Sequence, residues 1–109
     1  MIDGIGKDAE VTINENGGKQ SKSPFRFDLV PPEAMFKLAE VLAYGASRYT
    51  PNNWRLIPRN EHLNHAMTHI FAYMQGDTQD DHLGHALTRM VMAASVLEKE
   101  GHSYTEYKP

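Results

Sequence analysis

The sequence contains no cysteine, so neither disulfide bonds nor thiolate-bound zinc can stabilise the fold. It also lacks long hydrophobic runs: no stretch approaches the roughly 20 apolar residues of a membrane-spanning helix. The N-terminal residues show neither the basic start nor the apolar run of a secretion signal. These absences lead us to expect a cytoplasmic protein with no membrane partner.

Several common nucleotide-handling motifs are also missing. There is no dinucleotide-binding glycine motif and no nucleophile elbow. Gly18 and Lys19 resemble the end of a P-loop, but Ile13 stands where that loop requires its first glycine. A Glu-Glu-x-x-Glu run, which carries magnesium in helical nucleotide pyrophosphatases, is absent too. The sequence therefore assigns no catalytic residue, and a divalent metal such as Mg²⁺ is expected only if the protein is an enzyme.

The composition is that of an ordinary globular protein, with 40% hydrophobic and 23% charged residues in 109. This length predicts a single domain over residues 1–109. The net charge of −3 is unevenly distributed: residues 19–59 hold seven Lys or Arg and three acids, whereas residues 60–109 hold three and seven. The acidic total argues against a nucleic-acid polymer as partner, while the basic middle suits a small anion.

The expected fold is mainly α, a three-helix domain with a short N-terminal β-hairpin or arm. Alternating residues 11–13 precede a turn-forming cluster at 14–18, so residues 1–23 predict either a short hairpin or a partly flexible tail. Helices are predicted over 32–49, from the N-cap Asn60 to Met74, and from just after Asp80 to just before Gly101. Residues 98–109 are expected to form a C-terminal tail.

Apolar residues at spacings of three and four predict the core face of each helix. For the first helix these residues are Met35, Leu38, Leu42, Ala46 and Tyr49; for the second, Leu63, Met67, Ile70 and Met74; for the third, Leu83, Leu87, Met90, Ala94 and Leu97.

The second and third predicted helices contain an internal repeat. Residues 62–71 and 82–91 are identical at five of ten positions. Helical spacing places three of the repeated polar side chains on one stripe of each helix. The stripes are His62, His65 and His69 in the second helix, and His82, His85 and Arg89 in the third.

Three interpretations of these stripes stay open: a purely structural role, a phosphate-binding surface, or a divalent metal site. If the two helices pair as an antiparallel hairpin, the stripes face each other or line one rim of a cleft. The candidate metal ligands are His69, Asp81, His82 and His85; if the protein is a metal-dependent hydrolase, Asp77 and Asp80 are expected to help hold the metal and its water.

Aromatic, amide and basic side chains gather in the middle of the chain. A purine nucleotide needs this mixture, because its base stacks on flat apolar surfaces and its phosphates pair with guanidinium groups. With the histidine stripes included, the candidate nucleotide-binding residues are Arg26, Tyr44, Arg48, Tyr49, Asn53, Trp54, Arg55, His69, His82, His85 and Arg89.

The order of several short motifs resembles a known family. These motifs are residues 25–34 (FRFDLVPPEA), residues 44–49 (YGASRY), Asn53-Trp54, His69, Gly76-Asp77 and residues 82–86 (HLGHA). Across residues 19–97 they are similar to the N-terminal domain of the phage dATP/dGTP diphosphohydrolase family. The resemblance implies a purine nucleotide ligand and a setting in a bacteriophage, hence the cytoplasm of an infected bacterial host.

Two ligand-directed functions are open at this point, beside a purely structural or interaction role. In the first, a small viral protein sequesters a purine nucleotide, such as a cyclic dinucleotide of host antiviral signalling, and so evades host immunity without hydrolysing its ligand. The alternative is a divalent-metal-dependent dATP/dGTP diphosphohydrolase. A homo-oligomer is expected in either case, because the predicted apolar faces exceed what one short chain covers.

Overall fold

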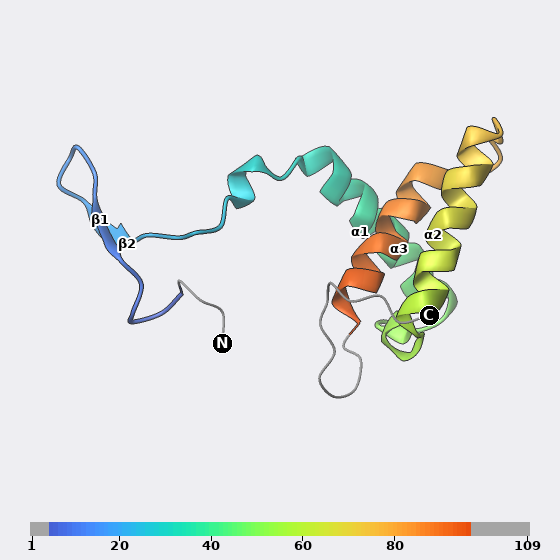
Figure 1. The fold of residues 1–109 in the computed structure, drawn as a ribbon, viewed down its shortest axis with the longest axis horizontal. Helices are drawn as coiled ribbons and strands as arrows, with labels where there is room; N and C mark the ends of the chain where they lie inside the picture. Colours follow the sequence, from blue (N-terminus) through green and yellow to red (C-terminus); the bar gives the residue numbers. More distant parts are fainter. Residues whose placement is uncertain (1–4, 97–109) are drawn as a thin grey trace. The chain divides into compact units, whose positions relative to one another are not determined.

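The computed structural model describes residues 5–96, and the chain falls into two compact units, Met1–Pro31 and Pro32–Pro109 (Figure 1). The described part contains three α-helices, two short strands and two short 3-10 helices. This confirms the predicted mainly helical fold with a short N-terminal hairpin. None of the helices within residues 5–96 has the length and apolar character needed to cross a membrane. The predicted tail at 98–109 lies outside the described residues, and the single domain over residues 1–109 stays a prediction.

The first unit contains an antiparallel hairpin of β1 (Val11–Ile13) and β2 (Lys19–Ser21). Its turn is held by the side chain of Asn14, whose Oδ1 accepts two backbone N–H groups at 2.9 and 2.8 Å. Gly17 takes a φ of 81°, a conformation that costs glycine little. Of the two alternatives for this segment, the structure shows the hairpin. A 3-10 helix, η1 (Phe27–Leu29), follows it.

The second unit begins with α1 (Pro32–Arg48), which ends one residue before the predicted end. Proline suits the first helical position because its missing N–H would have no partner there, and Glu33 complements the positive helix end. A short 3-10 helix, η2 (Asn53–Leu56), then connects α1 to α2.

The next helix, α2 (Arg59–Met74), is capped by Pro58, so the predicted N-cap Asn60 is wrong. The carbonyl of Pro58 accepts the first backbone N–H groups of the helix, and Asn60 lies inside the first turn. The predicted end is confirmed. Gly76 follows it with a φ of 86°, as expected for a residue that terminates a helix.

The last helix, α3 (His82–Ser95), runs antiparallel to α2 and contacts both α2 and α1 (Figure 1). Asp81 is its N-cap and accepts a hydrogen bond from the Gly84 backbone N–H at 3.2 Å. The helix ends earlier than predicted because Val96 is already extended, with φ −67° and ψ 122°. The expected antiparallel helix pair is confirmed.

The predicted core faces of α2 and α3 are wrong for most of their large residues. Small side chains fill the interior: Ala66, Ala86 and Ala93 are buried. Five large apolar residues of the predicted faces are instead exposed, namely Met67, Ile70, Met74, Leu83 and Met90. Leu63 and Leu87 are half-buried, and the predicted core residue Leu97 lies outside the described residues. Helical periodicity detects an apolar stripe but not the element that covers it. Here the stripe that meets the neighbouring helix is lined by small and polar residues.

Candidate functional site

A cavity of about 580 Å³ lies in the second unit, between the second half of α1, the segment that contains η2, and α3. We call it the α1–α3 cavity. Its volume lies within the range of about 300–1,000 Å³ that is typical of small-molecule sites. The lining includes these predicted nucleotide-binding residues: Tyr44, Arg48, Tyr49, Asn53, Trp54, Arg55, His85 and Arg89.

The charged residues that line this cavity are basic. Three arginines, Arg48, Arg55 and Arg89, line it together with His85. Within the part of the chain that the structure describes, its lining includes no aspartate or glutamate. A concave surface with guanidinium groups and no carboxylate favours an anion.

Two guanidinium groups in the cavity lie over aromatic rings. Arg55 lies 4.3 Å from the ring centroid of Trp54, and Arg48 lies 5.4 Å from that of Tyr49. Both distances fall within the range of cation–π attraction. Asn52, which precedes η2, adopts a left-handed φ of 65°, a conformation that asparagine tolerates better than most residues. The tight turn at Asn52 therefore brings the two aromatic–arginine pairs to one cavity.

His62 does not line the cavity but contacts two residues that do, Trp54 and Arg89. Its side chain is fully buried, its Nε2 lies 2.9 Å from the Trp54 carbonyl oxygen, and its Nδ1 lies 3.1 Å from Arg89 Nη1. A carbonyl only accepts, so Nε2 carries the proton and Nδ1 accepts from the guanidinium. Burial lowers the pKa of His62, which keeps the ring neutral. This one ring therefore positions both Trp54 and Arg89.

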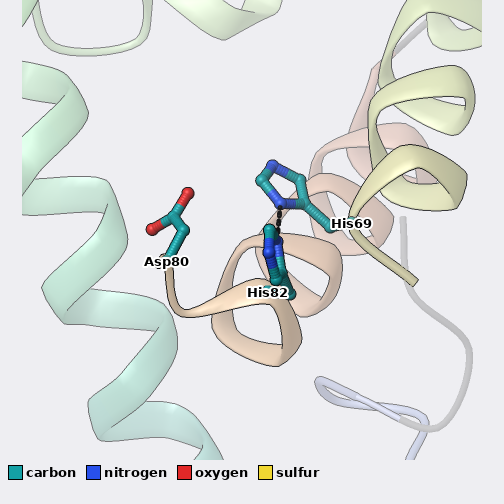
Figure 2. A group of neighbouring side chains, drawn as sticks. All are labelled: His69, Asp80 and His82. Carbon is teal, nitrogen blue, oxygen red and sulfur yellow. Dashed lines mark hydrogen bonds between the residues drawn. The ribbon is translucent and has the colours of Figure 1, made fainter. Parts of the chain in front are cut away.

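Beside the cavity, side chains from α2, α3 and the connection between them form a second group, which we call the imidazole cluster: His69, Asp77, Asp80, His82 and His85. The Nδ1 atoms of His69 and His82 lie 2.9 Å apart (Figure 2). His85 stacks on His69, with ring centroids 4.9 Å apart and an interplanar angle of 16°. Because His85 also lines the cavity, the cluster and the cavity are continuous.

Two carboxylates hold the imidazoles of this cluster. Asp77 Oδ2 lies 2.5 Å from His82 Nε2, and Asp80 Oδ1 lies 3.3 Å from His85 Nε2. The hydrogen bond from His82 lowers the pKa of Asp77. Burial, followed by the nearby charges of His85 and His82, lowers the pKa of His69. Within the cluster, these lowered pKa values favour a neutral imidazole at His69 and an ionised carboxylate at Asp77.

Ligand atoms of His69, Asp80 and His82 all lie within 4.8 Å of one another. Among residues 5–96 this is the group whose donor atoms could hold a metal ion. Two imidazoles and one carboxylate form a ligand set that suits transition-metal ions better than it suits Mg²⁺, because Mg²⁺ favours oxygen ligands.

Two of the residues singled out in the sequence are engaged elsewhere. Asp81 caps α3, and its Oδ2 lies 2.9 Å from Lys37 Nζ of α1, a contact that is the main cause of its lowered pKa. Arg26 belongs to the first unit, where its Nε and Nη2 each donate to Asp28 at 2.9 Å. Of the aspartates considered in the sequence analysis, Asp80 is the one whose carboxylate lies close enough to His69 and His82 to share a metal ion with them. Helix capping could have distinguished Asp81 from Asp80 in the sequence, because the side chain of the residue just before a helix usually accepts hydrogen bonds from the first backbone N–H groups.

The structure thus defines a small helical protein with an electropositive cavity and an adjoining cluster of imidazoles and carboxylates. The chain belongs to the family described as dATP/dGTP diphosphohydrolase, N-terminal, whose family model matches residues 14–105. Membership of this family implies a nucleotide ligand. No significant match to the chain was found among curated proteins or among solved structures.

Proposed function

We propose that this chain binds a purine nucleotide in the α1–α3 cavity and retains it without cleaving it. The observation that carries the proposal is the composition of the cavity lining, in which aromatic rings, amides and three arginines meet with no carboxylate among the described residues. Family membership supports a nucleotide as the ligand class.

Each part of a nucleotide has a suitable partner in this cavity. The indole of Trp54 and the phenol of Tyr49 offer flat faces for a base, and base–aromatic stacking contributes roughly 1–3 kcal/mol per base. The amide of Asn53 can bond the polar edge of a purine. Arg89 and His85, on α3, suit the phosphates because both can present N–H donors to an anion.

The presence of two aromatic–arginine pairs favours a ligand with two bases and two phosphates. Arg48 over Tyr49 and Arg55 over Trp54 offer two stacking surfaces with a cation at each. A cyclic purine dinucleotide of host antiviral signalling has this chemistry. In this form of the proposal, the protein acts in an infected bacterial cell, where a phage uses it to remove the signal and evade host immunity.

Retention without cleavage is proposed because, among residues 5–96, the cavity lining provides no carboxylate to act as a general base or to hold magnesium. A second candidate function is a metal-dependent dATP/dGTP diphosphohydrolase. One observation favours it specifically: His85 joins the cavity to the imidazole cluster, where His69, Asp80 and His82 could hold a divalent ion. The two functions predict different fates for the ligand.

The test is to incubate the pure protein with dATP, dGTP, purine monophosphates or cyclic purine dinucleotides, with and without Mg²⁺ or Mn²⁺. The protein is then denatured and the released ligand is identified by chromatography and mass. Intact ligand supports retention, cleaved ligand supports the hydrolase, and no bound or cleaved ligand contradicts both functions.

A matched pair of variants locates the site. Trp54→Ala removes a stacking surface and should weaken nucleotide binding by roughly 1–3 kcal/mol, or about 5- to 150-fold, in calorimetry. Phe71→Ala, an exposed aromatic residue of α2 outside the cavity lining, should leave affinity unchanged. Equal affinities for Trp54→Ala and the unmodified protein would move the site out of the α1–α3 cavity.

A further inference from the structure

We propose that His69, Asp80 and His82 form a site for one transition-metal ion, such as Zn²⁺ or Mn²⁺, in the imidazole cluster, whose remaining histidine, His85, lines the α1–α3 cavity. Figure 2 shows the rings of His69 and His82 meeting between α2 and α3, with the carboxylate of Asp80 beside them. The inference concerns metal binding alone and does not require that a nucleotide be bound.

The first argument is the orientation of His82. Its Nε2 lies 2.5 Å from a carboxylate oxygen of Asp77, and a carboxylate only accepts, so Nε2 carries a proton. The nitrogen of His82 left to bind a metal is therefore Nδ1, the atom that lies 2.9 Å from Nδ1 of His69. A histidine that ligates a metal usually donates its other N–H to a carboxylate in this way.

The second argument is the spacing of the donor atoms. The two Nδ1 atoms lie 2.9 Å apart, joined by a single hydrogen bond. Two imidazole nitrogens bound to one tetrahedral ion lie on the order of 3.3 Å apart, given metal–nitrogen bonds of about 2.0–2.1 Å. The rings need to separate by only a few tenths of an ångström, after the proton on His69 moves to its Nε2.

The surroundings stabilise this donor set. His82 is only 9% exposed, so its ring has little freedom to turn away. His85 stacks on His69 and contacts Asp80, so it orients two of the three ligands without being one of them. Asp77 and His85 are therefore positioning residues for the proposed site.

The donor chemistry selects the class of ion. Two nitrogen ligands and one oxygen ligand suit Zn²⁺, Mn²⁺, Co²⁺ or Ni²⁺, whereas Mg²⁺ prefers oxygen ligands. Three protein ligands also leave at least one coordination position open, as in catalytic zinc sites. His85, which stacks on His69 and lines the α1–α3 cavity, is the residue that the proposed site and the cavity share as a neighbour.

The experiment uses the full chain without an affinity tag, stripped with EDTA and desalted, and titrated with ZnCl₂, MnCl₂ or MgCl₂ by calorimetry. CoCl₂ adds a visible absorption spectrum that reports nitrogen ligation. We expect one Zn²⁺ per chain, a Co²⁺ spectrum of a site with imidazole ligands, and much weaker binding of Mg²⁺.

Variants then test the assignment. His69→Ala and Asp80→Asn should each lower Zn²⁺ affinity by more than about tenfold, and Asp77→Asn by about 10- to 100-fold through loss of orientation. His65→Ala removes an exposed histidine of the same helix and serves as the control, with affinity unchanged. Asp80 is about half exposed, so Asp80→Asn should retain the helical circular dichroism of the parent and keep the test valid if His69→Ala does not fold.

Absence of stoichiometric Zn²⁺ or Mn²⁺ binding would overturn the inference, as would unchanged affinity in Asp80→Asn or a loss in His65→Ala equal to that in His69→Ala. Nucleotide binding is measured separately in the presence of EDTA. Nucleotide binding without metal binding refutes only this inference, whereas metal binding without nucleotide binding refutes only the proposed function.

Discussion

Replacement of His62 by phenylalanine tests the idea that one buried ring supports the cavity wall. Phenylalanine keeps most of the volume of the ring but provides neither the N–H that the Trp54 carbonyl accepts nor the lone pair that Arg89 donates to. The variant therefore removes one hydrogen-bond partner from the Trp54 carbonyl and one from the Arg89 guanidinium, at part-buried contacts, while changing the packing little.

The expected loss of stability follows from these two contacts. A buried polar group left without its partner costs about 1–3 kcal/mol, so two such groups with some relaxation cost about 3 kcal/mol. For a unit of this size, that lowers Tm by roughly 12–24 °C. The matched control is His65→Phe, on the exposed face of the same helix, which should stay within about 0.5 kcal/mol of the parent.

The same variant also separates the pH dependence of His62 from that of the other histidines. Burial lowers the pKa of His62 below its ordinary value of about 6.5, and the charges of Arg89 and His65 act in the same direction. Above pH 6.5 the ring is neutral in both folded and unfolded chains, so its contribution to stability is fully present. As pH falls from 6.5 through the lowered pKa, the unfolded chain binds the proton first and this contribution is lost.

The assay is urea denaturation followed by circular dichroism at several pH values between 5 and 8. The unmodified protein should lose stability below pH 6.5, and His62→Phe should lose less over the same interval. Arg89→Met and the double variant complete a cycle, in which a coupling energy of at least about 0.5 kcal/mol is expected for residues in contact. A His62→Phe stability equal to that of His65→Phe, or a coupling energy near zero, would refute the reasoning.

Two further predictions concern the helix surfaces. Asp81→Ala should lower the free energy of unfolding by about 0.5–2 kcal/mol in urea denaturation, because it removes the N-cap of α3. Lys37→Met removes only the partly exposed ion pair between Lys37 and Asp81, and should cost less than about 1 kcal/mol. Equal costs for the two variants would contradict the capping role of Asp81. We also expect self-association through the apolar surface of α2, so light scattering should give an oligomer for the parent and a smaller species for Met67→Glu, which introduces a charge beside Ile70. A monomeric parent at micromolar concentration would contradict this expectation.

The sequence determined most of the secondary structure. The prolines at the start of α1 and the glycine after α2 each act on backbone groups within a few residues. Such signals do not depend on the rest of the fold. This is why the hairpin, the three helices and the end of α2 at Met74 were predicted correctly, whereas Asn60 failed as a cap because Pro58 already ended the preceding extended segment.

The residues that line the cavity were also largely accessible from the sequence. The aromatic–basic residues from Tyr44 to Arg55 are close along the chain, so a short turn suffices to bring them together. The internal repeat placed His85 and Arg89 on one stripe of a helix, and both of these residues line the cavity.

Only the tertiary structure decided which stripe of each helix faces inward. Periodicity identified an apolar stripe through Met67 and Ile70, but the close approach of α2 to α3 needs small side chains, and Ala66 and Ala86 supply them. The role of each histidine was decided in the same way. His62 bonds a carbonyl and a guanidinium, while His69 meets His82, although all three stand in equivalent stripes of the repeat. The protonation and pairing of an imidazole depend on the groups that folding brings to its two nitrogens, and these come from segments distant in the sequence.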